Sequence, residues 1–254
     1  MINKLPFVIT RPEKQGLQLK QALLQAGVDS ICQPLFEYQL ATNKAEILNV
    51  QQNVQPHILI FVSVAAVNYA NQAYPLSHWI SASTTVIAVG QATRQTLTAL
   101  GVESICPSQH DTEGMLSLPQ LSAAQLANHP TVLIVRGNGG RELLATQLRQ
   151  RGADTQYLES YQRVWLSMTE QVFELWQQKN VAGVIITSNA LLQRVVDLIN
   201  IKDNFWQNTC LWVVASERIK QTAQQLGLKK VINAQGADHQ AIVNAVLTMG
   251  LEHD

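Results

Sequence analysis

The sequence shows no excess of charge of one sign and no long hydrophobic run. Lys plus Arg and Asp plus Glu number 18 each among 254 residues, so no overall electric field favours nucleic acid or an anionic membrane surface. A local anion site remains compatible with this balance. The longest purely apolar runs, such as residues 58–62, are far too short to span a bilayer. We therefore expect neither a nucleic-acid partner nor a membrane-embedded segment.

Cysteines and targeting features are also scarce. The three cysteines, Cys32, Cys106 and Cys210, are odd in number and far apart, which favours free, buried thiols in a reducing compartment over a disulfide framework. The first ten residues, MINKLPFVIT, contain neither a long apolar stretch nor a small-residue cleavage site. We expect a cytoplasmic protein that acts as a monomer.

Common motifs for metals, phosphates and nucleophiles are missing. The six histidines have no metal-ligand spacing, so no metal site is expected. Gly137, Gly139 and Gly140 begin a dinucleotide fingerprint, but the third glycine of that fingerprint falls on Glu142. A nucleotide-dependent oxidoreductase is therefore disfavoured. We interpret this stretch as a strand-to-helix turn, with Asn138 as the helix N-cap and Glu142 in the first helical turn.

What the sequence does contain is a succession of short apolar runs between helical patterns. Hydrophobic residues make up 46% of the chain, enough for packed cores. Continuous apolar runs of strand length are typical of parallel sheets covered on both faces, which predicts an α/β fold. The predicted strands are 7–10, 58–62, 86–89, 132–135, 184–187, 211–214 and 231–233.

The chain also contains an internal repeat at an offset of 125 residues. Between residues 8 and 29, seven of 22 positions are identical to the shifted sequence, among them Arg11 with Arg136 and Gly27 with Gly152. The same shift pairs Ser63 with Ser188. The repeat predicts two similar flavodoxin-like parallel-sheet domains that arose by duplication.

Two partly alternating segments stand at the same offset, LFEYQL at 35–40 and SYQRVW at 160–165. Alternation of this kind is typical of a strand with one exposed side. We expect 35–40 and 160–166 to pair as a two-stranded β connector that acts as a hinge. The expected domains are then 1–36 with 167–254, which is discontinuous, and 40–160.

Small hydroxyl residues follow several predicted strands, namely Ser63, Thr93, Ser188 and Ser216. In parallel α/β domains, ligands bind beyond the carboxyl ends of strands, where helix N-termini attract anions. For each residue alone, N-capping explains the hydroxyl more simply. Together, in two facing domains, they form the hypothesis of an anion-binding cleft.

Three further residues have two interpretations each. Arg11 and Arg136, at equivalent strand ends, could bind anions or could fix the turn. Tyr161, in the expected connector, has Phe36 as its repeat partner and so has gained a hydroxyl. A phenol there could donate a proton to a leaving group, or could be an amphipathic packing residue with a solvated tip.

The order and spacing of several segments resemble the uroporphyrinogen-III synthases. The resemblance rests on VITRP, IFVS, AVG, RGNGGRELL, ESYQR, ITSNALL and VVASERI, and it spans essentially the whole chain. It implies two α/β domains joined by a two-stranded ladder. It also implies a cofactor-free closure of linear hydroxymethylbilane, with loss of water and inversion of the last pyrrole ring.

The resemblance also implies roles for individual residues. Tyr161 matches the tyrosine thought to assist departure of the hydroxyl. Substrate contacts map onto Ser63, Thr93, Ser188, Asn189 and Ser216. The partners would be the linear tetrapyrrole and, transiently, the preceding enzyme of the pathway. The alternative hypothesis is a non-catalytic two-lobed protein that closes on a small anionic ligand.

Overall fold

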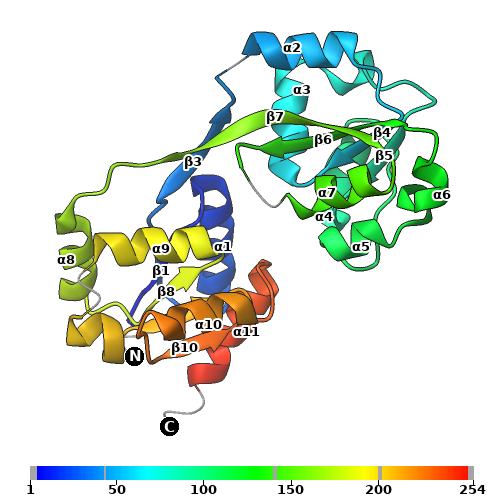
Figure 1. Cartoon of the computed structure of the whole chain (residues 1–254). Coiled ribbons are helices and arrows are strands. Elements are labelled where there is room, and N and C mark those ends of the chain that lie inside the picture. The colour runs from blue at the N-terminus through cyan, green and yellow to red at the C-terminus, as the bar shows by residue number, and fades with distance from the viewer. Residues whose placement is uncertain (1–4, 43, 140–141, 200–201, 251–254) are drawn as a thin grey trace. The chain divides into compact units, whose positions relative to one another are not determined.

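The structure is a computed structural model that describes residues 5–42, 44–139, 142–199 and 202–250 (Figure 1). Within these residues the chain forms an α/β fold with two five-stranded sheets. It divides into two compact units, residues 1–37 with 165–254, and residues 38–164. Both boundaries fall inside strands, β3 (Phe36–Leu40) and β7 (Asp154–Trp165).

The sheet of the first unit has the order β10-β9-β8-β1-β2, and all of its neighbouring strands are parallel. Its strands are β1 (Phe7–Ile9), β2 (Ser30–Cys32), β8 (Gly183–Ile186), β9 (Leu211–Val214) and β10 (Val231–Asn233). Strands β1, β8 and β9 are buried throughout, because helices cover both faces.

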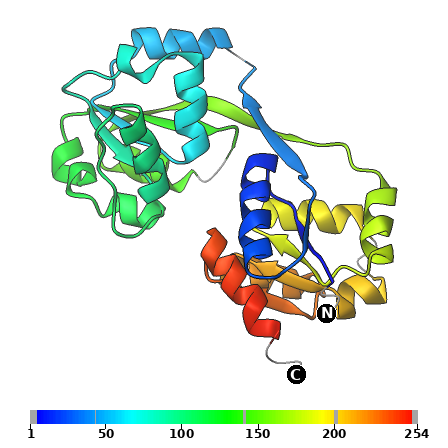
Figure 2. The ribbon, with the colours of Figure 1, turned by 180° about the vertical axis from the view of Figure 1, so that it is seen from behind.

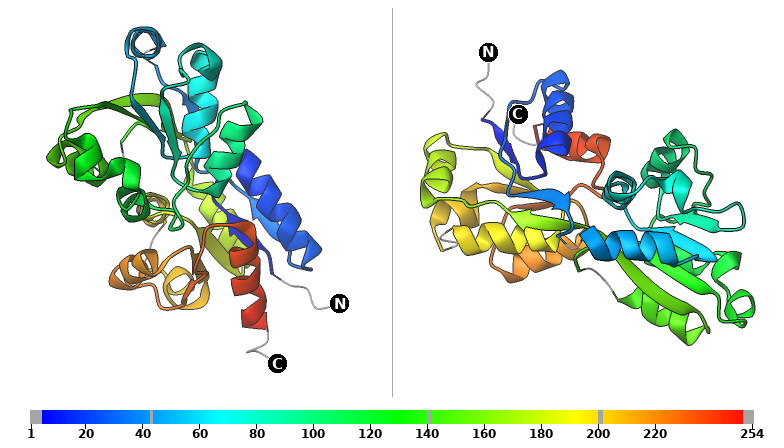
Figure 3. Two further views of the ribbon diagram at one scale, coloured as in Figure 1. Left: turned by 90° about the vertical axis from the view of Figure 1, so that its right-hand side faces the viewer. Right: turned by 90° about the horizontal axis from the view of Figure 1, so that it is seen from above.

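The helices described beside this sheet are α1 (Glu13–Gln25), α8 (Glu170–Gln178), α9 (Asn189–Leu198), α10 (Glu217–Gln225) and α11 (His239–Gly250), with a short π-helical turn η3 (Phe205–Thr209). Helices α1 and α11 lie side by side, as seen from behind in Figure 2. Figure 3 shows α9 and α10 together on the other side of the sheet. Each helix buries an apolar stripe, for example Leu19 and Leu23 of α1.

The sheet of the second unit has the order β3-β7-β6-β4-β5, where β4 is Ile58–Phe61, β5 is Thr85–Ala88 and β6 is Thr131–Gly137. One face packs on α2 (Lys44–Asn53), α3 (Val64–Ala73) and α4 (Gln91–Ala99), with Phe61 and Leu133 in the core. The other face packs on α5 (Thr112–Leu116), α6 (Ala123–Leu126) and α7 (Leu143–Gln150). Two single 3₁₀ turns, η1 (Leu76–His78) and η2 (Pro119–Leu121), complete the unit.

The repeat is visible in the strand order. The offset of 125 or 126 pairs β1 with β6, β2 with β7, β8 with β4 and β9 with β5. The order β2-β1-β8-β9 therefore corresponds to β7-β6-β4-β5. Position 105, which corresponds to the start of β10, forms a parallel bridge from Ile105 to Ile87 of β5. The two sheets thus have the same topology in their repeat-related strands.

The matched glycines of the repeat have the same structural role. Gly27 follows α1 and Gly152 follows α7, with φ angles of 72° and 107°. This left-handed conformation closes a helix C-terminus, and it strains any residue with a Cβ atom. The identity of these two positions in the sequence is therefore a backbone requirement at two equivalent helix ends.

All seven predicted strands are present; 211–214 and 231–233 agree at both ends, and the other five differ by one or two residues at an end. Two strands or parts of strands were not predicted. Strand β2 is only three residues long, and β7 begins at Asp154, well before the expected connector. The first half of β7 pairs in parallel with β6 from Thr131 to Arg136.

Candidate functional site

Three of the four hydroxyl residues cap helices at the carboxyl ends of strands. Ser63 Oγ accepts a hydrogen bond from Ala66 N at 3.0 Å and begins α3. Ser188 Oγ and Ser216 Oγ accept from the third residues of α9 and α10, at 3.2 and 3.5 Å. The N-cap interpretation is confirmed for these serines. Each cap also fixes a helix N-terminus, where the first N–H groups have no partner within the helix.

Thr93 is placed differently from the three serines. The N-cap of α4 is Gly90, so Thr93 lies in the first turn of the helix, and its side chain is only 3% exposed. The prediction that Thr93 sits in the turn is wrong. Gly90 occupies the capping position, and the helical period then directs Thr93 inward. A buried Thr93 has little surface to offer a ligand, so its predicted role in substrate binding stays a prediction.

Asn189 is the first residue of α9, directly after the Ser188 cap. Its Oδ1 atom is buried and has no hydrogen-bond partner among the described residues. Because β8 and β9 are parallel and pair up to Ile186 and Val214, the turns at Ser188 and Ser216 follow neighbouring strands at one edge of the sheet. Within this unit, the predicted polar residues of the two turns are therefore brought together.

The two repeat-related arginines are both buried and both engaged. Arg11 is 8% exposed, and its guanidinium donates to the carbonyl oxygen of Ala237. Arg136 is 9% exposed and pairs with Glu142 at 2.9 Å and Glu159 at 3.4 Å. Its guanidinium lies 3.9 Å from the centre of the Tyr157 ring. These contacts favour the turn-fixing interpretation over direct anion binding.

The Arg136 cluster replaces the capping arrangement that the sequence predicted for this turn. Helix α7 begins at Leu143, so Glu142 occupies its N-cap position, and the prediction of Asn138 as N-cap is wrong. Asn138 Oδ1 instead accepts from Arg163 N at 2.8 Å. The Asn138 side chain therefore bonds to the backbone of β7 and does not cap the helix. Gly140 of the expected turn lies outside the described residues.

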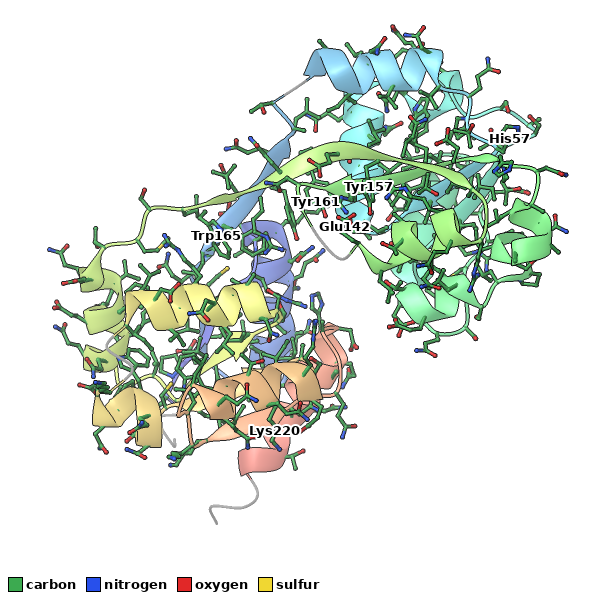
Figure 4. The ribbon with its side chains drawn as sticks, in the orientation of Figure 1. His57, Glu142, Tyr157, Tyr161, Trp165 and Lys220 are labelled. Carbon is green, nitrogen blue, oxygen red and sulfur yellow. The ribbon has the colours of Figure 1, made fainter. Side chains whose placement is uncertain are left out.

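Glu142 and Tyr157 are hydrogen-bonded at 2.7 Å beside Arg136, and both are labelled in Figure 4. Burial and the bond to Glu142 raise the pKa of Tyr157 to about 12. The bonds from Tyr157 and Arg136 hold the pKa of Glu142 below its ordinary value. At neutral pH the phenol of Tyr157 is therefore neutral and the carboxylate of Glu142 is ionised.

We expect the Tyr157 phenol to contribute to alkaline stability. Because its pKa in the folded state is about 12, above the ordinary value of 10, its contribution is present below pH 10 and is lost as the pH rises towards 12. The free energy of unfolding of the wild type and of Tyr157→Phe should converge over this interval in denaturant titrations. Tyr74→Phe, outside the cluster, is the matched control. Parallel curves for wild type and Tyr157→Phe between pH 9 and 12 would contradict the expectation.

Tyr161 lies on β7 with its phenol at the start of α3. Its hydroxyl oxygen is 3.2 Å from Ser63 Oγ, and the ring packs against the core cluster beneath α3. The ring meets Tyr38 edge-on at 4.9 Å and stacks with Tyr69 at 5.8 Å between centroids. The sequence did not predict these two neighbours, because nothing in a single tyrosine on β3 or α3 distinguishes it from a packing residue.

Burial raises the pKa of the Tyr161 phenol, and the hydrogen bond with Ser63 lowers it in part. The phenol is therefore protonated at neutral pH and can donate a hydrogen bond or a proton. Ser63 Oγ already accepts from Ala66 N, so one hydroxyl links the helix N-terminus to the phenol. Of the residues predicted for this unit, the fold brings together Ser63 and Tyr161.

Among the described residues, neither a metal-binding cluster nor a membrane-spanning helix accompanies this site. In the part of the chain that the structure describes, no three His, Cys, Asp or Glu side chains gather closely enough to hold a metal ion. Over the same residues, no helix is both long and apolar enough to cross a bilayer. The three cysteines are free, with Cys210 buried and the other two partly buried.

The fold and these side chains define a class of protein: a two-unit parallel α/β protein with capped helix N-termini and a partly buried phenol at the carboxyl ends of its strands. Comparison with known proteins narrows the class. The family model of uroporphyrinogen-III synthase HemD matches residues 18–244. The chain belongs to the uroporphyrinogen-III synthase family.

Individual relatives agree with this assignment. The chain is 30% identical over 247 residues to uroporphyrinogen-III synthase of Escherichia coli K12, covering 94% of this chain and 99% of that protein. It is 35% identical over 195 residues to uroporphyrinogen-III synthase of Proteus mirabilis, covering 75% of this chain and 96% of that protein.

Solved structures show the same fold. The chain matches a mutant uroporphyrinogen III synthase of Thermus thermophilus with a TM-score of 0.66 and 10% identity, over 98% of this chain and 100% of that one. It matches uroporphyrinogen-III synthetase of Helicobacter pylori 26695 with a TM-score of 0.60 and 14% identity, over 96% of this chain and 99% of that one.

Proposed function

We propose that the chain catalyses the reaction for which its family is named, the closure of hydroxymethylbilane to uroporphyrinogen III with loss of water and inversion of the last pyrrole ring. The family model and the relatives support an enzyme of tetrapyrrole biosynthesis that acts on a small linear substrate. The structural observation that carries the proposal is the protonated Tyr161 phenol, 3.2 Å from the Ser63 hydroxyl at the N-terminus of α3.

Tyr161 serves in this proposal as the proton donor to the departing hydroxyl. The carbon–oxygen bond of the terminal hydroxymethyl group breaks, and the oxygen leaves as water after it receives the proton. Like any tyrosine, this phenol holds its proton at neutral pH, and because burial raises its pKa further, it gives the proton up only to a strongly basic group such as the departing oxygen. Ser63 orients the phenol by hydrogen bonding.

The capped helix N-termini bind the substrate carboxylates in this proposal. Ser63 in one unit, and Ser188, Asn189 and Ser216 in the other, each stand at such an N-terminus. An anion at an exposed helix N-terminus gains roughly 0.3–1 kcal/mol, and more when partly buried. Several weak carboxylate contacts of this kind suit a chain with no net charge, in which Arg11 bonds to Ala237 and Arg136 pairs with glutamates. Holding the two ends of the substrate together can lower the barrier by roughly 7–11 kcal/mol.

The proposal extends to the architecture. In chain order, the first sheet reads 2-1-3-4-5, the flavodoxin-like order, and the repeat-related strands of the second sheet follow it. We interpret the units as two flavodoxin-like domains, 1–36 with 167–254 and 40–160, joined by a connector made of 35–40 and 160–166. Adjacent strands β3 and β7 support this connector. Monomeric action in the cytoplasm, with transient contact to the preceding enzyme, is part of the same proposal.

Isomer analysis tests the reaction directly. Incubation with freshly prepared hydroxymethylbilane, followed by separation of the oxidised porphyrins, should give predominantly isomer III. Heat-denatured protein is the control and should give isomer I, the product of unassisted closure. If the folded protein also gives isomer I alone, the proposed catalysis fails, and the non-catalytic anion-binding protein becomes the better hypothesis.

A further inference from the structure

The ladder between β6 and β7 contains an irregularity just before Tyr161. Arg136 pairs with Glu159, but the next residue of β6, Gly137, pairs with Tyr161. Ser160 is therefore an extra residue on β7, a β-bulge. Because side chains alternate along a strand, Tyr161 would otherwise share the face of the exposed Glu159. With the extra residue, Tyr161 shares the face of Leu158, on which α3 packs.

Hydrogen bonds hold this bulge in place on both sides. Ser160 is completely buried, and its hydroxyl lies 3.2 Å from the carbonyl oxygen of Ala66 and 3.4 Å from that of Arg136. The first carbonyl belongs to α3 and the second to β6. Just beyond the bulge, Asn138 N donates to the carbonyl oxygen of Tyr161 at 2.9 Å. The backbone around Tyr161 is thus fixed to the helix that carries Ser63.

Gly137 provides the space that the Tyr161 ring occupies. A Cβ atom on Gly137 would lie 2.5 Å from Cε2 and 2.6 Å from Cζ of that ring, well inside van der Waals contact. Gly137 is not among the glycines with positive φ, so backbone conformation does not explain its presence. The ring cannot simply move aside, because Tyr38 and Tyr69 pack against it.

We propose that Gly137 and Ser160 are positioning residues of the active site, which direct the Tyr161 phenol to the N-terminus of α3. This inference rests on the proposed function, since it assigns the two residues to the reaction through Tyr161. Neither residue touches the substrate in this scheme. Their effect is to set where the phenol stands relative to Ser63.

The main test is Gly137→Ala, assayed at a temperature where the variant is folded. Displacement of the ring should lower kcat by roughly 10²-fold, the cost of misplacing a reacting group by about 1 Å, with little change in KM. Gly183→Ala is the matched control, because its Cβ would also clash, at 2.4 Å from the Leu211 carbonyl oxygen, but in the other unit. It should lower the thermal midpoint and leave kcat unchanged.

A double-mutant cycle with Tyr161→Ala separates positioning from general damage. Removal of the ring opens the space that the new Cβ needs, so Gly137→Ala should cost nothing further in kcat or thermal midpoint in that background. Equal losses in both backgrounds, or unchanged kcat for Gly137→Ala alone, would overturn the proposal. The thermal cycle uses no substrate, so it decides the geometry even if isomer analysis rejects the proposed function.

Ser160→Ala provides a second variant if Gly137→Ala does not fold. It introduces no clash and removes only the hydroxyl that anchors the bulge to Ala66 and Arg136. We expect a loss of kcat that is smaller than that of Gly137→Ala, with little change in KM. In the Tyr161→Ala background, Ser160→Ala should cause no further loss of kcat. A Ser160→Ala variant with wild-type kcat would count against the role of the bulge.

Discussion

Replacing Tyr161 with phenylalanine is expected to lower kcat by about 10²-fold, the lower end of the range for general acid catalysis. The ring contacts with Tyr38 and Tyr69 do not need the hydroxyl, so the packing of the site is retained. The variant loses one hydrogen bond to Ser63, worth about 0.5–1.5 kcal/mol of stability. KM should change little, because helix N-termini supply the carboxylate contacts.

Steady-state kinetics with freshly prepared hydroxymethylbilane, together with thermal unfolding, measure these two effects separately. Tyr157→Phe is a matched control on the same strand, since its phenol bonds to Glu142 and not to Ser63. It should retain wild-type kcat. Unchanged turnover in Tyr161→Phe, or an equal loss in both variants, would remove the proposed role of Tyr161.

Replacing Trp212 with alanine should cause the largest loss of stability, about 3–5 kcal/mol. Trp212 is fully buried on β9, and its indole nitrogen donates to the carbonyl oxygen of Trp206 at 3.0 Å. Its ring packs 6.4 Å from that of Trp206, which in turn meets Trp176 at 6.3 Å between centroids. The substitution leaves a large cavity and an unpaired carbonyl in the first unit.

Chemical denaturation monitored by circular dichroism would show the loss. The damage is confined to the first unit, so the unfolding curve should split into an early and a late transition, the late one from residues 38–164. Leu175→Ala is the control, because Leu175 is 46% exposed on α8 and should change stability by less than about 0.5 kcal/mol. A Trp212→Ala curve that overlays the wild type would contradict the structure of this core.

Much of the fold could be predicted because its signals are continuous and buried. Runs such as Ile58–Phe61 are apolar at every position, which is typical of a strand covered on both faces. The short strand β2 gives no such run, since it has only three residues and two of them are partly exposed. The first half of β7 alternates, and a polar alternating segment after a glycine is hard to separate from a loop.

The candidate site was harder to predict than the fold. Ser63, Ser188 and Ser216 follow strands closely, so local capping chemistry decides their position. Thr93 follows its strand at a greater distance, and the Gly90 cap places it within the helix. The bulge at Ser160 depends on pairing with a strand some 24 residues earlier, which a local pattern does not contain. The sequence pattern predicts Gly137 as a turn glycine, whereas it is the last residue of β6 and lies against the ring of Tyr161.

The pairing of β1 with β8 affects how the chain folds as it is made. Residues 38–164 are contiguous and can fold once they leave the ribosome, whereas β1 pairs with a strand that begins only at Gly183. Until then, the newly made protein carries the apolar strand Phe7–Ile9 without its partner on that side. If translation stops soon after residue 164, the product is the unit 38–164 with an N-terminal segment whose apolar strand β1 has an unpaired edge. Unpaired apolar strands promote aggregation, so we expect this product to be bound by chaperones or degraded by proteases.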